Sequence, residues 1–221
     1  MSALTWLNID DSPEHFPDVD SALNDPEGLL AAGGDLSPAR LLTAYRCGIF
    51  PWYSQGQPIL WWSPNPRTVL FPTEFKASRS LEKTARNKGF QLSIDQDFSG
   101  VMEGCADPEL RTTGTWITAD MQSAYLELHR LGHAHSIEVR LNHLLVGGLY
   151  GVRLGNIFFG ESMFSRTSDA SKIALKTLCE GILGYTPILI DCQMATAHLQ
   201  SLGARNVPRA EFIKLLNKHL G

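Results

Sequence analysis

The stretch AHSIEVRLNHLLVGGLYGVRLGNIFFG, residues 134–160, is the most regular part of the chain. Two apolar runs, Ala134 to Leu141 and Leu144 to Leu154, follow one another closely, and Asn156 to Gly160 opens a third. Runs of this length and composition predict two adjacent antiparallel strands and the start of another strand. A β-sheet is therefore expected at the centre of this half of the chain.

Helices and further strands are expected on both sides of this hairpin. Strands are predicted at Thr68–Phe71, Phe90–Ile94 and Ile188–Gln193. Helices are predicted from apolar spacing and end signals at 78–88, 98–105, 118–131, 170–183, 195–202 and 209–219. Hairpin strands, a helix, a buried strand and another helix resemble acyltransferases of the N-acetyltransferase type, a likeness of topology that says nothing of activity.

The first 65 residues are rich in Gly and Pro and read as short helices between turns. Ser37 to Gly48 has the signals of a small helix: Ser37 at the N-cap, Pro38 at the first position and Gly48 after the end. The aromatic runs 49–53 and 59–64 are flanked by prolines and cannot be helical, so they form either a packed lid or an aromatic platform. We predict an α+β protein with a small N-terminal domain (1–65) and an acyltransferase-like mixed sheet flanked by helices (66–221).

Composition favours a packed globular protein, with 43% hydrophobic and 9% aromatic residues in 221. Met1 to Asp11 lack the basic and apolar regions of a secretory signal. The most apolar stretches, such as Leu144 to Val152, are shorter than the roughly 20 residues of a membrane span. A soluble cytoplasmic protein is expected. Its four cysteines form no CxxC pair, which favours buried thiols over zinc ligands or a catalytic thiol.

Charge is distributed unevenly behind the net value of −4. Residues 1–39 hold eight of the 23 acidic residues and no Lys or Arg, which leaves 19 basic against 15 acidic residues in the remainder. Much of the excess lies in one stretch, with Arg67, Lys76, Arg79, Lys83, Arg86 and Lys88. Such a stretch is either a solvated helix face or a surface that binds phosphate.

The strand Ile188–Gln193 is apolar until Asp191 and Gln193 appear at its end. Alternation places these two side chains on one face, about 6.5 Å apart, with Cys192 on the other. The carboxylate would then accept a hydrogen bond from the Gln193 side-chain amide and leave its carbonyl oxygen facing outward. The alternative is that the strand ends at the protein surface, where both polar side chains are simply solvated.

A second polar cluster, Gly160-Glu-Ser-Met-Phe-Ser165, is expected where a strand ends in a loop before a helix. Glu161 could then enter a cleft beside the sheet, or it could be an ordinary surface carboxylate. Ser162 is not a nucleophile elbow, because Phe164 stands where that motif needs glycine.

Two other chemistries are disfavoured by the sequence. His129, His133 and His135 suggest a metal site, but Gly132 interrupts the helix that would align His129 with His133. A CoA-dependent acetyltransferase would need a glycine-rich pyrophosphate turn, and Arg153-Leu-Gly-Asn-Ile157 does not fit one.

Seven runs occur in one order along residues 16–213: 28–42, 46–52, 59–67, 114–118, 132–139, 160–165 and 189–193. Together they resemble the leucyl/phenylalanyl-tRNA–protein transferase family. The resemblance implies transfer of Leu or Phe, with Met as a further candidate, from aminoacyl-tRNA to the α-amine of proteins that begin with Lys or Arg. Such proteins are thereby marked for degradation by the N-end rule. No cofactor, no metal and no membrane partner are expected.

The resemblance also implies roles for individual residues. Trp52 and Trp116 would lie around the 3′ adenosine of the tRNA, where base stacking contributes about 1–3 kcal/mol per base. Leu149, Phe158 and Met163 would line the pocket for the Leu or Phe side chain. The basic stretch from Arg67 to Lys88 would contact the tRNA backbone.

A mechanism follows as a hypothesis. The Gln193 carbonyl accepts a hydrogen bond from the attacking amine, Asp191 holds the Gln193 amide, and Glu161 orients the acceptor peptide or the adenosine. The final proton acceptor is left open between Asp191, water and the leaving ribose hydroxyl. Three alternatives stay open: aminoacyl transfer from tRNA to a cell-wall precursor, CoA-dependent N-acetylation, and a non-catalytic RNA-binding module.

Overall fold

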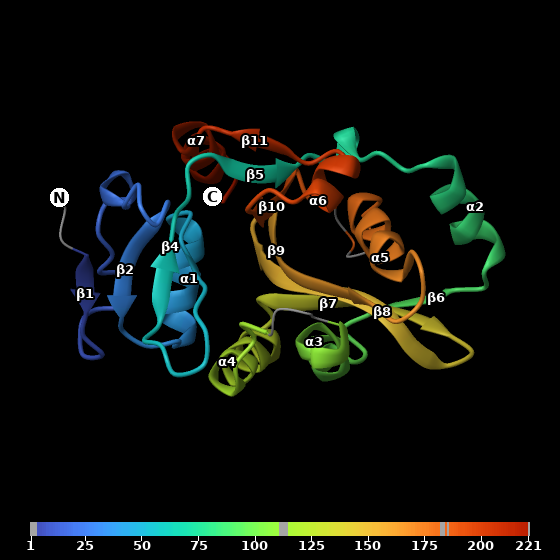
Figure 1. The fold of residues 1–221 in the computed structure, drawn as a ribbon, viewed down its shortest axis with the longest axis horizontal. Coiled ribbons are helices and arrows are strands. Elements are labelled where there is room, and N and C mark those ends of the chain that lie inside the picture. Colours follow the sequence, from blue (N-terminus) through green and yellow to red (C-terminus); the bar gives the residue numbers. More distant parts are fainter. Residues whose placement is uncertain (1–3, 111–114, 182–183, 185, 221) are drawn as a thin grey trace.

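Two β-sheets of different size lie side by side in the computed structural model (Figure 1). The structure describes residues 4–110, 115–181, 184 and 186–220. The smaller sheet has the order β1-β2-β4-β3. Its strands are β1 (Thr5–Leu7), β2 (Leu29–Gly33), β4 (Leu60–Trp62) and β3 (Phe50–Pro51). Helix α1 (Pro38–Arg46) connects β2 with β3.

The larger sheet has seven strands in the order β11-β5-β10-β9-β8-β7-β6, and among these neighbours only β9 and β10 run parallel. The strands are β11 (Arg205–Val207), β5 (Arg67–Leu70), β10 (Leu189–Gln193), β9 (Ile157–Ser165), β8 (Leu144–Leu154), β7 (Ala134–Leu141) and β6 (Gln91–Ile94). The predicted hairpin 134–154 is confirmed, and so is the mixed α+β class.

Helices cover both faces of the larger sheet (Figure 1). On one face lie α3 (Phe98–Ala106) and α4 (Ala119–Arg130), and on the other lies α5 (Ala170–Cys179) with α2 (Arg79–Asn87) beside it. The remaining helices are α6 (Ala197–Ser201), α7 (Arg209–His219) and the 3-10 turns η1 (Val19–Ser21), η2 (Pro72–Glu74) and η3 (Pro108–Leu110). The end of the helix expected at 170–183 lies partly outside the described residues.

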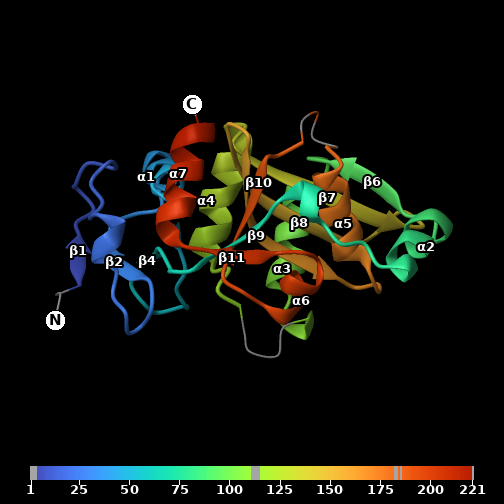
Figure 2. The ribbon, with the colours of Figure 1, turned by 90° about the horizontal axis from the view of Figure 1, so that it is seen from above.

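One hydrophobic core runs through both sheets. It joins Leu30 and Tyr45 of the N-terminal part to Phe159 of β9 and to Phe212 of α7. Figure 2 shows α1 and α7 next to each other where the two parts meet. Gly48 ends α1 with φ of +73°, and a Cβ atom there would lie 2.6 Å from Ile213 Cδ1. Glycine therefore permits both the left-handed turn and the approach of α7.

Two predictions about secondary structure are wrong. Residues 4–65 form a sheet and one α-helix in place of the expected short helices between turns, because strands of two to five residues are too short to show a hydrophobic alternation. Residues 160–165 are not a loop: β9 continues to Ser165, since the eleven-residue β8 supplies partners such as Leu149 for Met163 and Gly147 for Ser165.

The aromatic residues of the N-terminal part differ in burial. Trp61 is fully buried and donates from Nε1 to the Gly33 carbonyl at 2.9 Å, while Trp52 is 38% exposed.

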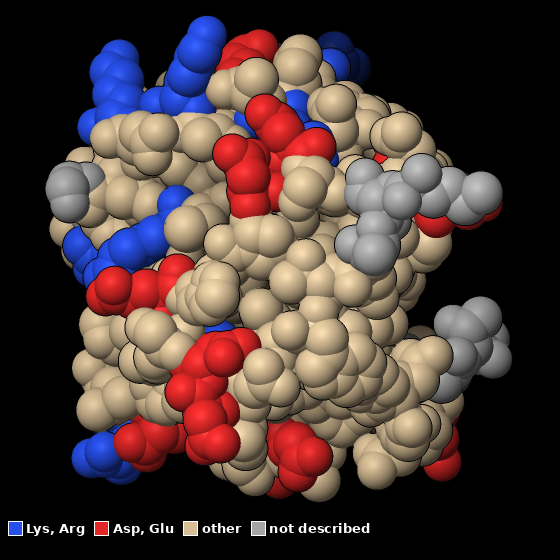
Figure 3. All heavy atoms as spheres, turned by 90° about the vertical axis from the view of Figure 1, so that its left-hand side faces the viewer, with Lys and Arg blue, Asp and Glu red and all other residues tan. Residues whose placement is uncertain are grey.

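The unequal distribution of charge along the chain is visible on the molecular surface. Acidic side chains spread over the end of the molecule that carries β1 and β2 (Figure 3), where the exposed acids of the first segment are Asp10, Glu14, Asp18, Asp20, Asp25 and Glu27.

Within the part of the chain that the structure covers, every helix is too short or too polar to cross a bilayer.

Candidate active site

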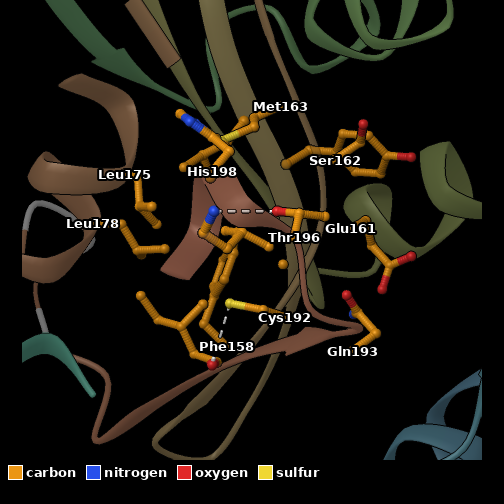
Figure 4. A pocket seen from close by; sticks show the side chains of 15 residues that line it. Phe158, Glu161, Ser162, Met163, Leu175, Leu178, Cys192, Gln193, Thr196 and His198 are labelled. Carbon is orange, nitrogen blue, oxygen red and sulfur yellow. Dashed lines mark hydrogen bonds between the residues drawn. The ribbon is translucent and has the colours of Figure 1, made fainter. Parts of the chain in front are cut away.

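An apolar cavity of about 250 Å³ opens between β8, β9, β10, α5 and α6 (Figure 4). Leu149, Phe158 and Met163, singled out from the sequence, all line it. Leu175 and Leu178 of α5 and Ile190 of β10 complete its apolar wall. A cavity of about 150 Å³ holds a benzene ring, so this one is large enough for the side chain of Leu or Phe.

A larger cavity of about 680 Å³ adjoins the first and is lined by both Trp52 and Trp116. The Trp52 ring lies 5.6 Å from the Trp62 ring, centroid to centroid, and Trp62 Nε1 donates to the Trp52 carbonyl at 2.7 Å. These contacts hold a half-exposed indole in place. The two cavities share five lining residues: Glu161, Cys192, Gln193, Thr196 and Leu199.

Asp191 lies beneath this junction and not in it. Its side chain is fully buried, and its two carboxylate oxygens accept from Arg67 Nε at 2.8 Å and Arg67 Nη2 at 2.6 Å. Arg67 is 1% exposed, donates from Nη1 to the Gly48 carbonyl at 3.0 Å, and lies between the rings of Phe50 and Phe212. The ion pair thus ties β5 and β10 to the N-terminal part and to α7.

Two predictions about Asp191 and Arg67 need correction. Asp191 does not hold the side-chain amide of Gln193; its Oδ1 accepts from the Gln193 main-chain N at 3.0 Å. Arg67 is buried in the ion pair and is not part of an exposed basic surface. Sequence reasoning could not find this pair, because 124 residues separate its members.

Gln193 reaches the junction through a break in strand geometry. The register of β10 against β5 shifts between Asp191 and Gln193, and Gln193 has φ of +56°. Strict alternation therefore fails, and Cys192 and Gln193 both line the cavities while Asp191 does not. Gln193 Nε2 is buried with no hydrogen-bond partner in the described chain. An amide in this state is available to a ligand.

Glu161 is half-buried on β9 and faces the same junction (Figure 4). Tyr45 of α1 donates to its Oε1 at 2.7 Å, and Tyr125 of α4 donates to its Oε2 at 2.9 Å. Burial raises the pKa of Glu161 to about 7, with the tyrosine hydrogen bonds acting in the opposite direction. The sequence does not predict either tyrosine as a site residue, because nothing in their spacing distinguishes them from core residues.

The other basic residues of the predicted stretch are separate from the cavities. Lys76, Arg79, Lys83 and Arg86 are exposed, and Lys88 is half-buried over the Phe90 ring. Three of them lie on α2, which packs against α5, and α5 in turn lines the apolar cavity.

Neither thiol nor metal chemistry is supported at the junction. Burial raises the pKa of Cys192 far above its ordinary value, so the thiol stays protonated at neutral pH. His129 Nδ1 lies 2.8 Å from the Ala134 carbonyl, and His135 Nδ1 lies 2.8 Å from Asp95 Oδ2. In the described ranges no three His, Cys, Asp or Glu side chains are grouped to hold a metal ion.

Comparison with known proteins identifies the family. Residues 69–217 match the model described as leucyl/phenylalanyl-tRNA protein transferase, and residues 34–65 match the model for the N-terminal domain of the same proteins. The chain belongs to the leucyl/phenylalanyl-tRNA protein transferase family. Membership makes it an aminoacyltransferase.

The leucyl/phenylalanyl-tRNA–protein transferase of Stutzerimonas stutzeri is 56% identical over 217 residues, covering 98% of this chain and 95% of that protein. The same enzyme of Pseudomonas entomophila is 58% identical over 217 residues, with 98% and 95% covered. Solved structures are more distant. FemX is 9% identical with a TM-score of 0.48, covering 80% of this chain and 70% of its own. A GCN5-related N-acetyltransferase from Kribbella flavida is 9% identical with a TM-score of 0.40, covering 76% and 60%.

Proposed function

We propose that this transferase moves leucine or phenylalanine, with methionine as a further donor, from aminoacyl-tRNA to the α-amine of proteins that begin with Lys or Arg. The product would carry a new N-terminal residue that marks it for degradation by the N-end rule in the cytoplasm. The observation that carries the proposal is the pair of adjoining cavities: one is apolar, one is walled by two tryptophans, and they meet at Glu161 and Gln193.

We propose that the two cavities together hold the 3′ end of an aminoacyl-tRNA. In our proposal the terminal adenine lies against Trp52 and Trp116, since unpaired bases stack on aromatic side chains. The amino acid side chain enters the apolar cavity, which excludes charged side chains through the cost of desolvation. Flexible Met163 adapts the wall to both branched and aromatic shapes. The ester bond would then lie at the junction.

Positioning accounts for most of the proposed catalysis. Aminolysis of an ester is downhill, so the site has to bring the amine to the carbonyl carbon and handle one proton. The Gln193 carbonyl accepts a hydrogen bond from the amine, and its unpartnered Nε2 is left to donate to the donor substrate. Asp191 acts through Gln193 by holding its main-chain N–H. A carboxylate at Glu161 suits acceptors with a cationic first residue.

The proposal is tested by transfer of radiolabelled leucine from Leu-tRNA to a peptide that begins with Arg. Label on this peptide, but not on the same peptide with an acetylated N-terminus, is the expected result. A peptide beginning with Asp serves as the control for acceptor choice. Absence of label with intact tRNA and folded protein would refute the proposal, and label on a lipid-linked cell-wall precursor instead would favour the alternative acceptor.

The basic residues on α2 give a separate prediction about the tRNA. We expect Lys83→Ala with Arg86→Ala to weaken transfer from full-length Leu-tRNA and to lower the salt dependence of binding by about one unit of log–log slope per lost phosphate contact. Transfer from leucyl-adenosine, which lacks the phosphates of the stem, should be unchanged. The matched control is Lys214→Ala with Lys218→Ala, two exposed lysines of α7. Equal loss with both donors would place α2 outside the tRNA contact.

A further inference from the structure

The hydroxyls of Tyr45 and Tyr125 and the carboxyl of Glu161 form a closed ring of hydrogen bonds. Tyr45 contacts Oε1 and Tyr125 contacts Oε2, at 2.7 and 2.9 Å, and the two hydroxyls also contact each other. The three side chains come from α1, α4 and β9. Both tyrosines are fully buried, whereas Glu161 lines both cavities. The ring therefore has one member in contact with the substrate space.

The protonation state of Glu161 decides how many of the three oxygen–oxygen contacts can be hydrogen bonds. Each phenol brings one hydrogen, so an ionised Glu161 leaves two hydrogens for three oxygen–oxygen contacts. A protonated Glu161 brings the third, and each group then donates one hydrogen bond and accepts one. Burial disfavours the charged carboxylate more than the two tyrosine hydrogen bonds favour it, and the pKa of Glu161 is raised to about 7. The ring has room for one exchangeable proton, and we expect Glu161 to take it up and release it near neutral pH.

Of the three side chains in this ring, Glu161 is the one expected to gain and lose a proton. Burial raises the pKa values of Tyr45 and Tyr125 well above their ordinary value, so both stay protonated. Tyr150 of β8 lies against Tyr125, with ring centroids 5.8 Å apart. The nearby charges are Asp191, which favours the protonated form of Glu161, and Arg67, which opposes it. Those two are already bound to each other.

We propose that Glu161 accepts the proton that the attacking α-amine releases and passes it to the leaving ribose oxygen, with Tyr45 and Tyr125 as the residues that position it. This inference rests on the proposed function. The amine nitrogen forms a bond to the ester carbonyl carbon, and the bond from that carbon to the ribose oxygen breaks. The nitrogen loses one proton and the ribose oxygen gains one, so Glu161 ends the cycle as it began. A base whose pKa lies near the working pH is suited to this exchange.

The test compares single-turnover transfer rates at saturating acceptor between pH 6 and 8.5, expressed as the ratio of wild type to variant. The ratio cancels the titration of the acceptor amine. For Glu161→Gln we expect a ratio of about 10²–10⁴ at pH 8. It should fall about tenfold by pH 6, because the wild-type carboxylate is protonated there. A ratio that does not change with pH would overturn the proposal.

The tyrosines are tested by Tyr45→Phe with Tyr125→Phe. Loss of two donors should raise the pKa of Glu161 further, since both hydrogen bonds lower it. Transfer should then be severalfold slower than wild type at pH 7 and recover at pH 8.5. A purely structural loss would persist at both pH values and would contradict the positioning role. Tyr53→Phe is the matched control, a buried tyrosine whose hydroxyl lies 3.4 Å from the Thr118 hydroxyl and which lines neither cavity.

A titration that needs no turnover separates this inference from the proposed function. Carbon-13 NMR of protein labelled at the glutamate carboxyls, with Glu161→Gln to assign the signal, should show a midpoint near pH 7. The double phenylalanine variant should shift this midpoint upward. An ordinary midpoint, about 4.3, would refute the proton-holding ring even if leucine is transferred. A wild type that transfers no leucine would refute the function, whatever the midpoint.

Discussion

Replacing Asp191 by alanine is expected to lower the free energy of unfolding by about 3–5 kcal/mol, because it leaves the Arg67 guanidinium buried without its counter-charge. It should also slow leucine transfer by an order of magnitude or more, since Gln193 loses the acceptor that fixes its main chain. Urea unfolding gives the first quantity, and single-turnover transfer under fully native conditions gives the second.

The double variant Arg67→Met with Asp191→Leu separates the two effects. Removing both charges from a buried site is often neutral or stabilising, so most of the lost stability should return. The transfer rate should stay low, because leucine offers no acceptor to the Gln193 N–H. Wild-type stability in Asp191→Ala would contradict the burial of the pair. Full recovery of transfer in the double variant would show that Asp191 does not position Gln193.

Replacing Leu149 by phenylalanine is expected to change the choice of amino acid. Leu149 is buried on β8 opposite Met163 of β9, and both line the apolar cavity. One extra methylene in such a pocket changes kcat/KM by about 10–200-fold. An added ring should therefore lower kcat/KM for Phe-tRNA at least tenfold, and lower it less for Leu-tRNA.

The matched control is Leu145→Phe, four residues earlier on the same strand and half-buried, outside both cavities. It should leave the preference between Leu and Phe unchanged. Equal loss for both donors in Leu149→Phe, with normal thermal unfolding, would mean that the amino acid side chain binds elsewhere.

The centre of the larger sheet could be predicted because β7, β8 and β9 have eight to eleven residues, and the helices could be predicted because they carry end signals. Ser37, the predicted N-cap of α1, accepts a hydrogen bond from the third residue of that helix, and Ser78 and Thr118 do the same at α2 and α4. The small sheet could not be predicted in this way. Its strands have two to five residues, and Pro51 stands within β3, so no hydrophobic period could develop.

Only part of the site could be predicted from the amino-acid sequence. The lining of the apolar cavity followed from the family resemblance. Gln193 was predicted as a polar residue at the end of an apolar strand, and Glu161 as a polar residue of a loop that is in fact part of β9. What alternation could not show is the bulge after Asp191, which turns Gln193 into the cavity and leaves Asp191 beneath it. Contacts made across the fold, such as Arg67 with Asp191 or Tyr45 with Glu161, depend on which strands and helices become neighbours.

The most direct test is a crystal structure with phenylalanyl-adenosine in which an amide replaces the reactive ester. We expect the adenine to lie against Trp52 and Trp116, the phenyl ring to fill the cavity of about 250 Å³, and the carbonyl carbon to lie between Glu161 and Gln193. A phenyl ring outside that cavity, or an adenine away from both tryptophans, would contradict this placement.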